Sequence, residues 1–324
     1  MIHILRMCAF SFVALSLFTG LSFAEADKAK PEKIRFAYQP IHTLLIVASE
    51  QGWFKEEFEK DGISFEAVKF LAGPPIIEAF AGGRIDFGLT GDQPALLARA
   101  NNIDIKAVGV ALSGPKTLSL VVPTGSKITR IKDLKGKKVG VTVGSVAHHL
   151  LYLYLQKNGL KPTDVKLVNL LPPDIKTSIE QKVIDAAITW DPWVSILEDE
   201  KNGKQIADAT GFKLNANVIL VSGKFAADHP DLVKRVLKVL VKSEKWIKKN
   251  PEEAITIAAK ATGNKREIQA KSFAKINYDI RLTPEVIKSF EQTTAFLRES
   301  NVLRKDVDVK SLVDTSYLKA IGAQ

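Results

Sequence analysis

The chain repeats one pattern twice at a nearly constant offset, and this repeat limits its possible folds more than any other feature. The segment 74–76 (PPI) returns at 172–175 (PPDI), and 85–92 (IDFGLTGD) returns at 184–191 (IDAAITWD). The offset is 98 residues at the prolines and 99 residues at the aspartates. A repeat that spans a whole strand–helix–strand block predicts two similar lobes.

Each copy of the repeat alternates short apolar strands with helices. In the first copy, strands are predicted at 33–39, 63–71, 85–91 and 104–112, with helices between them. The helix 74–83 begins with proline and ends with glycine, as helices often do. Repeated β-α-β units with short connections predict an α/β protein in which each lobe is a mostly parallel sheet flanked by helices.

The predicted domain organisation follows from the repeat. Residues 25–117 form the first segment of lobe 1, 118–214 form lobe 2, and 215–324 return to lobe 1. The return segment carries three or four helices and no sheet of its own, so it must pack on an existing lobe. The strands Leu118–Pro123 and Asn217–Gly223 bracket the second copy, and they are the predicted crossovers and hinge.

The first 24 residues have the features of a secretory signal peptide. Arg6 is followed by a short apolar stretch and then by Ser22-Phe23-Ala24, a small-x-small cleavage pattern. The only cysteine, Cys8, lies in this segment. We therefore expect a mature chain that is periplasmic and soluble after cleavage near Ala24, with a core large enough to need no disulfides.

The formal net charge is +10. The lysines are interleaved with acids along helix faces and turns, and no stacking-aromatic motif accompanies them. This pattern argues against nucleic-acid binding and favours a soluble basic monomer. No residue pattern predicts a metal site, a cofactor or a catalytic residue.

Several motifs together resemble the ABC-importer periplasmic binding proteins of the aliphatic sulfonate, taurine and nitrate family. They include "IRFAYQ", "LKGKKVGVTVGSVAHHLL", "LKPTDVKLVNLLPPD", "IDAAITWDPW" and "FAADHPDLVKRVL", and the match runs from Lys33 to about Val309. The resemblance implies a type II, two-lobed periplasmic-binding-protein fold with two crossover strands as hinge. It also implies a permease partner and a sulfonate ligand, captured between the lobes for sulfur uptake.

Relatives with similar motifs carry nitrate, phosphonates, aromatic sulfonates or thiamine precursors, and these ligands remain alternatives. An enzyme on the same fold, such as one that makes thiamine precursors, is a further alternative. The export signal and the absence of a catalytic cysteine or a histidine cluster in the mature chain speak against it. A sensory module is disfavoured because the sequence contains no signalling domain.

Ligands of open α/β sheets bind at the carboxyl ends of the strands, and the echoed T-x-D motifs lie at such ends in both copies. A sulfonate is a monoanion that needs neutral or positive donors, which helix N-termini supply. The predicted ligand-binding residues share a position at a strand end or a helix start: Gln39, Gly73, Thr90, Gly91, Asp92, Gly144, Ser145, His148, Trp190 and Asp191. The candidate loops contain no lysine or arginine, which predicts recognition by neutral donors.

Individual roles differ among these residues. Ser145 is expected as an N-cap whose hydroxyl can face a ligand, and Asp92 as the cap of its own helix, because a carboxylate cannot donate to an anion. Trp190 is expected either to line the site or to lie in the core, since one of Trp190 and Trp193 must face inward.

The adjacent histidines at 148 and 149 cannot both face one ligand, because consecutive helical positions point about 100° apart. Neither has a metal-binding partner at i+3 or i+4. By the family resemblance His148 is the site candidate and His149 a helix-face residue. His42, near the start of the first helix, is a weaker candidate.

Overall fold

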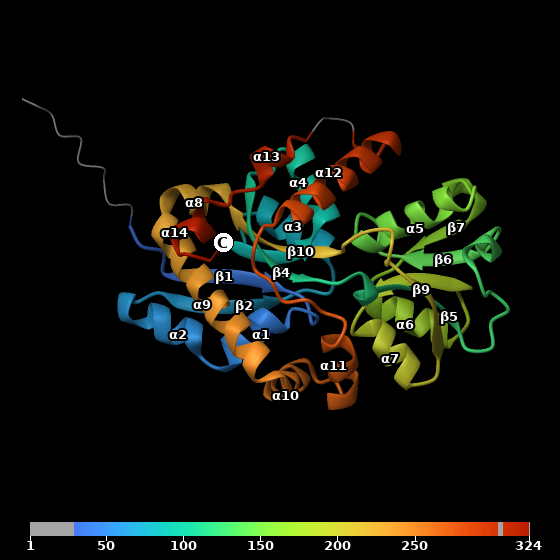
Figure 1. Ribbon diagram of the computed structural model, residues 1–324, viewed down its shortest axis with the longest axis horizontal. Coiled ribbons are helices and arrows are strands. Elements are labelled where there is room, and N and C mark those ends of the chain that lie inside the picture. The colour runs from blue at the N-terminus through green and yellow to red at the C-terminus, as the bar shows by residue number, and fades with distance from the viewer. Residues whose placement is uncertain (1–28, 304–306, 324) are drawn as a thin grey trace, which may run out of the picture.

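A computed structural model describes residues 29–303 and 307–323, and the predicted signal peptide lies outside them. Two five-stranded sheets lie side by side and form the centres of two lobes (Figure 1). The sheet of lobe 1 has the order β2 (Ser64–Lys69), β1 (Lys33–Tyr38), β3 (Phe87–Gly91), β10 (Ala216–Ser222), β4 (Ile105–Ser113). The sheet of lobe 2 has the order β7 (Lys166–Asn169), β6 (Lys138–Val141), β8 (Ala186–Trp190), β5 (Leu118–Pro123), β9 (Gly203–Asp208).

The two sheets have the same topology. Strands β10 and β5 run antiparallel to both of their neighbours, and the other two pairings in each sheet are parallel. Each sheet is therefore mixed, with four of its five strands running in the same direction. The first aspartate of each repeated segment, Asp86 or Asp185, makes the same hydrogen bond in its lobe. Asp86 accepts from the Arg35 N–H and Asp185 from the Lys138 N–H, each at 2.8 Å. Sequence analysis missed β9, an edge strand whose charged and half-buried residues carry no apolar alternation.

Helices cover both faces of each sheet (Figure 1). In lobe 1 they are α1 (Thr43–Glu50), α2 (Trp53–Phe58), α3 (Gly73–Ala81) and α4 (Asp92–Ala100), and in lobe 2 α5 (Val146–Lys157), α6 (Pro172–Glu180) and α7 (Trp193–Asp199). Single 3-10 turns lie at Glu59–Asp61, Pro115–Thr117, Ile131–Leu134 and Pro162–Asp164. The run expected as one helix from His42 divides at Gly52, whose φ of 71° lies in the left-handed region that interrupts a helix.

The return segment packs mainly on lobe 1 and also contacts lobe 2 at several points. Its helices are α8 (Gly223–Asp228), α9 (Pro230–Lys249), α10 (Pro251–Thr262), α11 (Arg266–Phe273), α12 (Pro284–Glu299), α13 (Val309–Leu312) and α14 (Ser316–Ala320). The apolar stripe of α9 is buried against α1 and the sheet, whereas α11 lies beside α7 of lobe 2 (Figure 1). Within the described ranges, no helix combines the length and apolarity needed to cross a membrane.

The chain crosses between the lobes in two short segments, 114–117 and 209–215. Each crossing comes immediately before a strand predicted as a crossover. Those strands, β5 and β10, are themselves the antiparallel members of the two sheets. Any movement of one lobe relative to the other must therefore be taken up in these two segments.

Helix α5 is held to the lobe 2 sheet by a buried tyrosine. Tyr154 is fully buried, and its hydroxyl donates to the Asp208 carbonyl at the end of β9 at 2.6 Å. The preceding tyrosine, Tyr152, is only half-buried, and its ring packs on His148 and Phe296 instead.

We expect Tyr154→Phe to lower the free energy of unfolding by about 1–2 kcal/mol, because the Asp208 carbonyl loses its buried donor. Tyr152→Phe is the matched control, and it should change stability by less than about 0.5 kcal/mol. Urea unfolding followed by circular dichroism measures both values. Equal effects of the two substitutions would show that the Tyr154 hydroxyl contributes nothing to holding α5.

Candidate ligand-binding site

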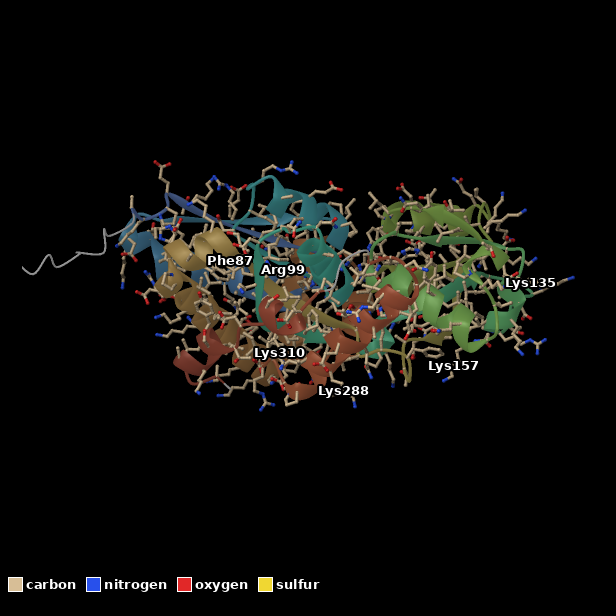
Figure 2. All side chains as sticks on the ribbon, turned by 90° about the horizontal axis from the view of Figure 1, so that it is seen from above. Phe87, Arg99, Lys135, Lys157, Lys288 and Lys310 are labelled. Atoms are coloured by element: carbon tan, nitrogen blue, oxygen red, sulfur yellow. The ribbon has the colours of Figure 1, made fainter. Side chains whose placement is uncertain are left out.

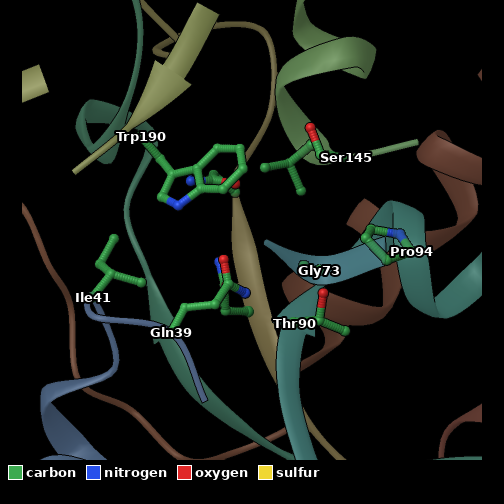
Figure 3. A pocket seen from close by; sticks show the side chains of 11 residues that line it. Gln39, Ile41, Gly73, Thr90, Pro94, Ser145 and Trp190 are labelled. Atoms are coloured by element: carbon green, nitrogen blue, oxygen red, sulfur yellow. The ribbon is translucent and has the colours of Figure 1, made fainter. Parts of the chain in front are cut away.

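A small cavity lies between the two lobes, where the carboxyl ends of their parallel strands face each other. Its empty volume is about 330 Å³, which includes space open to solvent. Its lining residues come from both lobes and from the second crossing: Gln39, Ile41, Gly73, Thr90, Gly91, Pro94, Ser145, Val146, Trp190, Asn215 and Asn217. Figure 3 shows Ser145 and Trp190 on the lobe 2 side, facing Gln39 and Thr90 of lobe 1.

Six of the ten predicted residues line this cavity. They are Gln39, Gly73, Thr90, Gly91, Ser145 and Trp190. The other four, Asp92, Gly144, His148 and Asp191, adjoin the lining but do not belong to it. Sequence reasoning missed five lining residues, of which two, Asn215 and Asn217, are polar.

Three helices begin at the cavity. Gly73 is the first residue of α3, Gly91 is the N-cap of α4, and Ser145 is the N-cap of α5. The first backbone N–H groups of a helix lack intrahelical partners, and the helix dipole places partial positive charge there. These helix N-termini therefore favour an anion in the cavity, although no cationic side chain of the described residues lines it.

Thr90 supplies an unused hydroxyl in the cavity wall. Its Oγ1 is buried and has no hydrogen-bond partner among the described residues. The neighbouring glycine leaves room for it, because a Cβ at Gly73 would lie 2.2 Å from the Thr90 Oγ1. A buried hydroxyl without a partner is costly unless a ligand or water completes it.

The polar groups of the turn Gly144-Ser145 are largely hydrogen-bonded to the turn itself and to the start of α5. Ser145 is the N-cap as predicted, accepting from the Ala147 N–H at 3.2 Å and donating to the Thr142 carbonyl at 2.6 Å. The Gly144 N–H donates to His148 Nδ1 at 3.3 Å, so His148 folds back over the turn and does not reach into the cavity. Burial lowers the pKa of His148 and keeps its ring neutral at pH 7.

Asp92 is not the cap that the sequence predicts. Gly91 occupies the N-cap position, and the Asp92 carboxylate accepts from the Gln93 N–H at 2.9 Å and does not line the cavity. It accepts from Lys213 Nζ at 2.8 Å and from the Thr293 hydroxyl at 2.7 Å, and both members of the ion pair are buried. No local sequence pattern indicates this partner, because Lys213 lies 121 residues away.

Asp191, the repeat equivalent of Asp92, makes the same kind of contact. Its carboxylate accepts from Lys275 Nζ at 2.8 Å and from the Ser195 hydroxyl at 2.5 Å. The preceding residue, Trp190, is the inward-facing tryptophan that lines the cavity, whereas Trp193 does not line it.

No charged side chain lines the cavity: among the described residues, the eleven that line it include none. The labelled lysines are exposed on the outer surfaces, Lys135 and Lys157 on lobe 2 and Lys288 and Lys310 on lobe 1 (Figure 2). The cavity can thus hold an anion only through neutral donors and helix termini.

The other two histidines near the cavity, His42 and His149, are buried and contact other protein residues. His149 packs face to face on Phe296 of α12, with ring centroids 4.3 Å apart, and accepts from Lys213 Nζ at 3.1 Å. It therefore joins the lobes and is not an exposed helix-face residue. His42 is fully buried at the start of α1 and contacts Gln39 and Asn217, both of which line the cavity.

Two similar lobes around a small neutral cavity define the architecture of a solute-binding protein. Comparison with known proteins agrees with this class. A protein-family model described as NMT1/THI5 like matches residues 39–254, and the chain belongs to this family.

Several individual relatives are named as sulfonate- or taurine-binding proteins. The chain is 32% identical over 306 residues to a Bacillus subtilis (strain 168) protein named for aliphatic sulfonate binding, covering 93% of this chain and 91% of that protein. It is 30% identical over 241 residues to the taurine-binding periplasmic protein of Escherichia coli (strain K12), covering 73% of each. The alkanesulfonate-binding protein SsuA from Xanthomonas axonopodis pv. citri, solved bound to MOPS, superposes with a TM-score of 0.81 at 28% identity. That superposition covers 88% of this chain and 99% of the other.

The buried His42 predicts that stability falls as the pH is lowered. Burial lowers its pKa to about 4 from an ordinary value of 6.5, so the unfolded chain binds more protons than the folded chain between these values. We expect His42→Gln to reduce the loss of unfolding free energy between pH 7 and pH 5 by about 2 kcal/mol relative to the wild type. Urea unfolding at the two pH values measures this difference, and equal losses in both proteins would contradict it.

Proposed function

We propose that the chain is the solute-binding component of an ABC importer and captures an aliphatic sulfonate, such as an alkanesulfonate or taurine, between its lobes. It acts in the periplasm after cleavage near Ala24 and delivers the ligand to permease subunits for sulfur uptake. The observation that carries the proposal is the neutral cavity at three helix N-termini, with the Thr90 hydroxyl left without a partner.

The chemistry of this cavity suits a fully ionised monoanion. A sulfonate carries one charge at physiological pH and exchanges no proton with the protein. Neutral N–H and O–H donors at helix termini stabilise one such charge. A phosphonate dianion would need more compensation than the uncharged lining offers, because removing the second charge from water is costly.

Binding without chemistry is the role that the lining supports. The lining residues include no acid, base or thiol that could serve as a catalytic group. The relatives described above are binding proteins by name. Closure of the lobes at the segments 114–117 and 209–215 would enclose the ligand.

Calorimetry on the mature chain, residues 25–324, tests this proposal. We expect binding of ethanesulfonate or taurine at micromolar Kd or tighter, and binding of ethylphosphonate at least about tenfold weaker. Tight phosphonate binding without sulfonate binding would overturn the proposal.

The internal repeat supplies a matched pair of variants for this experiment. Thr90→Val removes the unpartnered hydroxyl from the cavity wall and should weaken sulfonate binding by about tenfold. Thr189→Val removes the equivalent hydroxyl of lobe 2, which is also buried and without a partner among the described residues but does not line the cavity. Thr189→Val should leave the Kd unchanged. Equal effects of the two variants would show that the Thr90 hydroxyl does not contact the ligand.

A second prediction concerns the approach of the two lobes. A Cβ at Gly91 would lie 2.2 Å from Val146 Cγ1 on the opposite lobe, so Gly91→Ala should hold the lobes apart and weaken ligand binding by at least about tenfold. The control is Gly82→Ala at the exposed end of α3, where the nearest atom to a Cβ is the Arg84 Nε at 3.3 Å. Wild-type affinity in Gly91→Ala would show that binding does not need this approach.

A further inference from the structure

A buried histidine fixes the orientation of one amide in the cavity wall. His42 is the residue before α1, and it is fully buried. The backbone N–H of Gln39 donates to His42 Nδ1 at 2.9 Å. The backbone N–H of His42 donates in turn to the Gln39 carbonyl at 2.9 Å. Because a backbone N–H can only donate, Nδ1 must carry a lone pair and no proton.

The other ring nitrogen of His42 must then be a donor. Burial lowers the pKa of His42 to about 4, so the ring is neutral near pH 7 and carries its single proton on Nε2. Nε2 lies 3.2 Å from the Asn217 Oδ1. The donor on His42 requires an acceptor opposite it, so the carbonyl oxygen of this amide must face the histidine.

The orientation of Asn217 leaves its amino group as an available donor. Asn217 lines the cavity from β10 and pairs with Gly91 of β3 in the sheet register. Its Nδ2 has no hydrogen-bond partner among the described residues, although the side chain is largely buried. Two N–H donors are thus held next to the start of α4.

The other asparagine of the lining, Asn215, has its side-chain amino group engaged in a hydrogen bond. The Thr117 hydroxyl donates to the Gly114 carbonyl at 2.6 Å and therefore accepts from the Asn215 Nδ2 at 2.9 Å. One N–H of the Asn215 amide is used in this hydrogen bond, and the Asn215 Oδ1 is an acceptor without a partner among the described residues. Of the two asparagines, only Asn217 presents an unused amino group.

We propose that Asn217 contacts the bound anion through Nδ2 and that His42 is the positioning residue that holds this amide with its donors toward the cavity. The inference rests on the proposed function, because it assigns a contact to the same sulfonate site. Asn217 would then also contribute to specificity, because its amino group cannot pair with a ligand group that is only a hydrogen-bond donor. His42 itself does not touch the ligand.

The tautomer can be tested without any ligand. Long-range ¹H–¹⁵N spectra of the free mature protein with labelled histidine should show His42 protonated at Nε2 and unprotonated at Nδ1 at pH 7. A ring protonated at Nδ1 would overturn the positioning role, whichever anion the protein binds. This measurement therefore separates failure of the inference from failure of the proposed function.

The contact is tested by ethanesulfonate titration of Asn217 variants. Asn217→Leu removes the donors at similar volume and should raise the Kd at least about tenfold, while Asn217→Asp should raise it further because it adds a negative charge. Asn102→Asp, on an exposed loop away from the cavity, controls for net charge. Wild-type affinity in Asn217→Leu would overturn the contact.

The positioning role is tested by two substitutions of His42. His42→Gln can still accept from the Gln39 N–H and donate to Asn217, so its Kd should stay within about threefold of wild type. His42→Phe can do neither and should weaken binding at least about tenfold. Thermal unfolding of both variants confirms that they fold, and the Asn217 side-chain amide signal should shift on binding in wild type and His42→Gln alone. Equal affinities of the two variants would show that His42 serves only to fill space.

Discussion

The echoed aspartates Asp92 and Asp191 are buried where the third parallel strand of each lobe ends, and each is neutralised by a lysine from outside the repeat. Lys213 comes from the second crossing and Lys275 from the return segment, and both ion pairs have N–O distances of 2.8 Å. An uncompensated carboxylate at such a position would be strongly unfavourable, costing about 3–5 kcal/mol when one partner of a buried pair is removed. The two lysines thus make it possible to bury these carboxylates beside the cavity.

These ion pairs also connect the parts of the molecule that meet at the cavity. Lys213 contacts Asp92 of lobe 1 and His149 of lobe 2, and Lys275 joins the lobe 1 side to Asp191 of lobe 2. With the carboxylates compensated behind the wall, the cavity itself is lined only by neutral groups. Its potential is then set by helix N-termini and by individual hydroxyl and amide donors, which suits a monoanion better than a cation or a dianion.

The duplicated architecture places related residues in different roles. Thr90 and Thr189 occupy equivalent strand ends, yet only Thr90 lines the cavity. The lobe 2 wall contributes Trp190 instead, where lobe 1 has Gly91. Lobe 1 therefore supplies most of the polar lining residues, and lobe 2 supplies an aromatic surface.

Much of the fold and about half of the lining could be predicted from the sequence. The repeat, the strand–helix alternation and the helix starts at Gly73, Gly91 and Ser145 are local patterns, and they led to most of the predicted residues that line the cavity. Edge strand β9 and the break at Gly52 were missed, because a half-exposed strand lacks alternation and one glycine does not reveal its φ.

The sequence by itself determined that two similar lobes place strand ends and helix N-termini toward each other, because these features depend on short-range periodicity and on the repeat. Only the tertiary structure decided which side chains meet there. Asp92 and Lys213 are 121 residues apart and His42 and Asn217 are 175 apart. Such pairs are selected by packing and by the need to satisfy buried polar groups, and neither condition leaves a periodic trace along the chain.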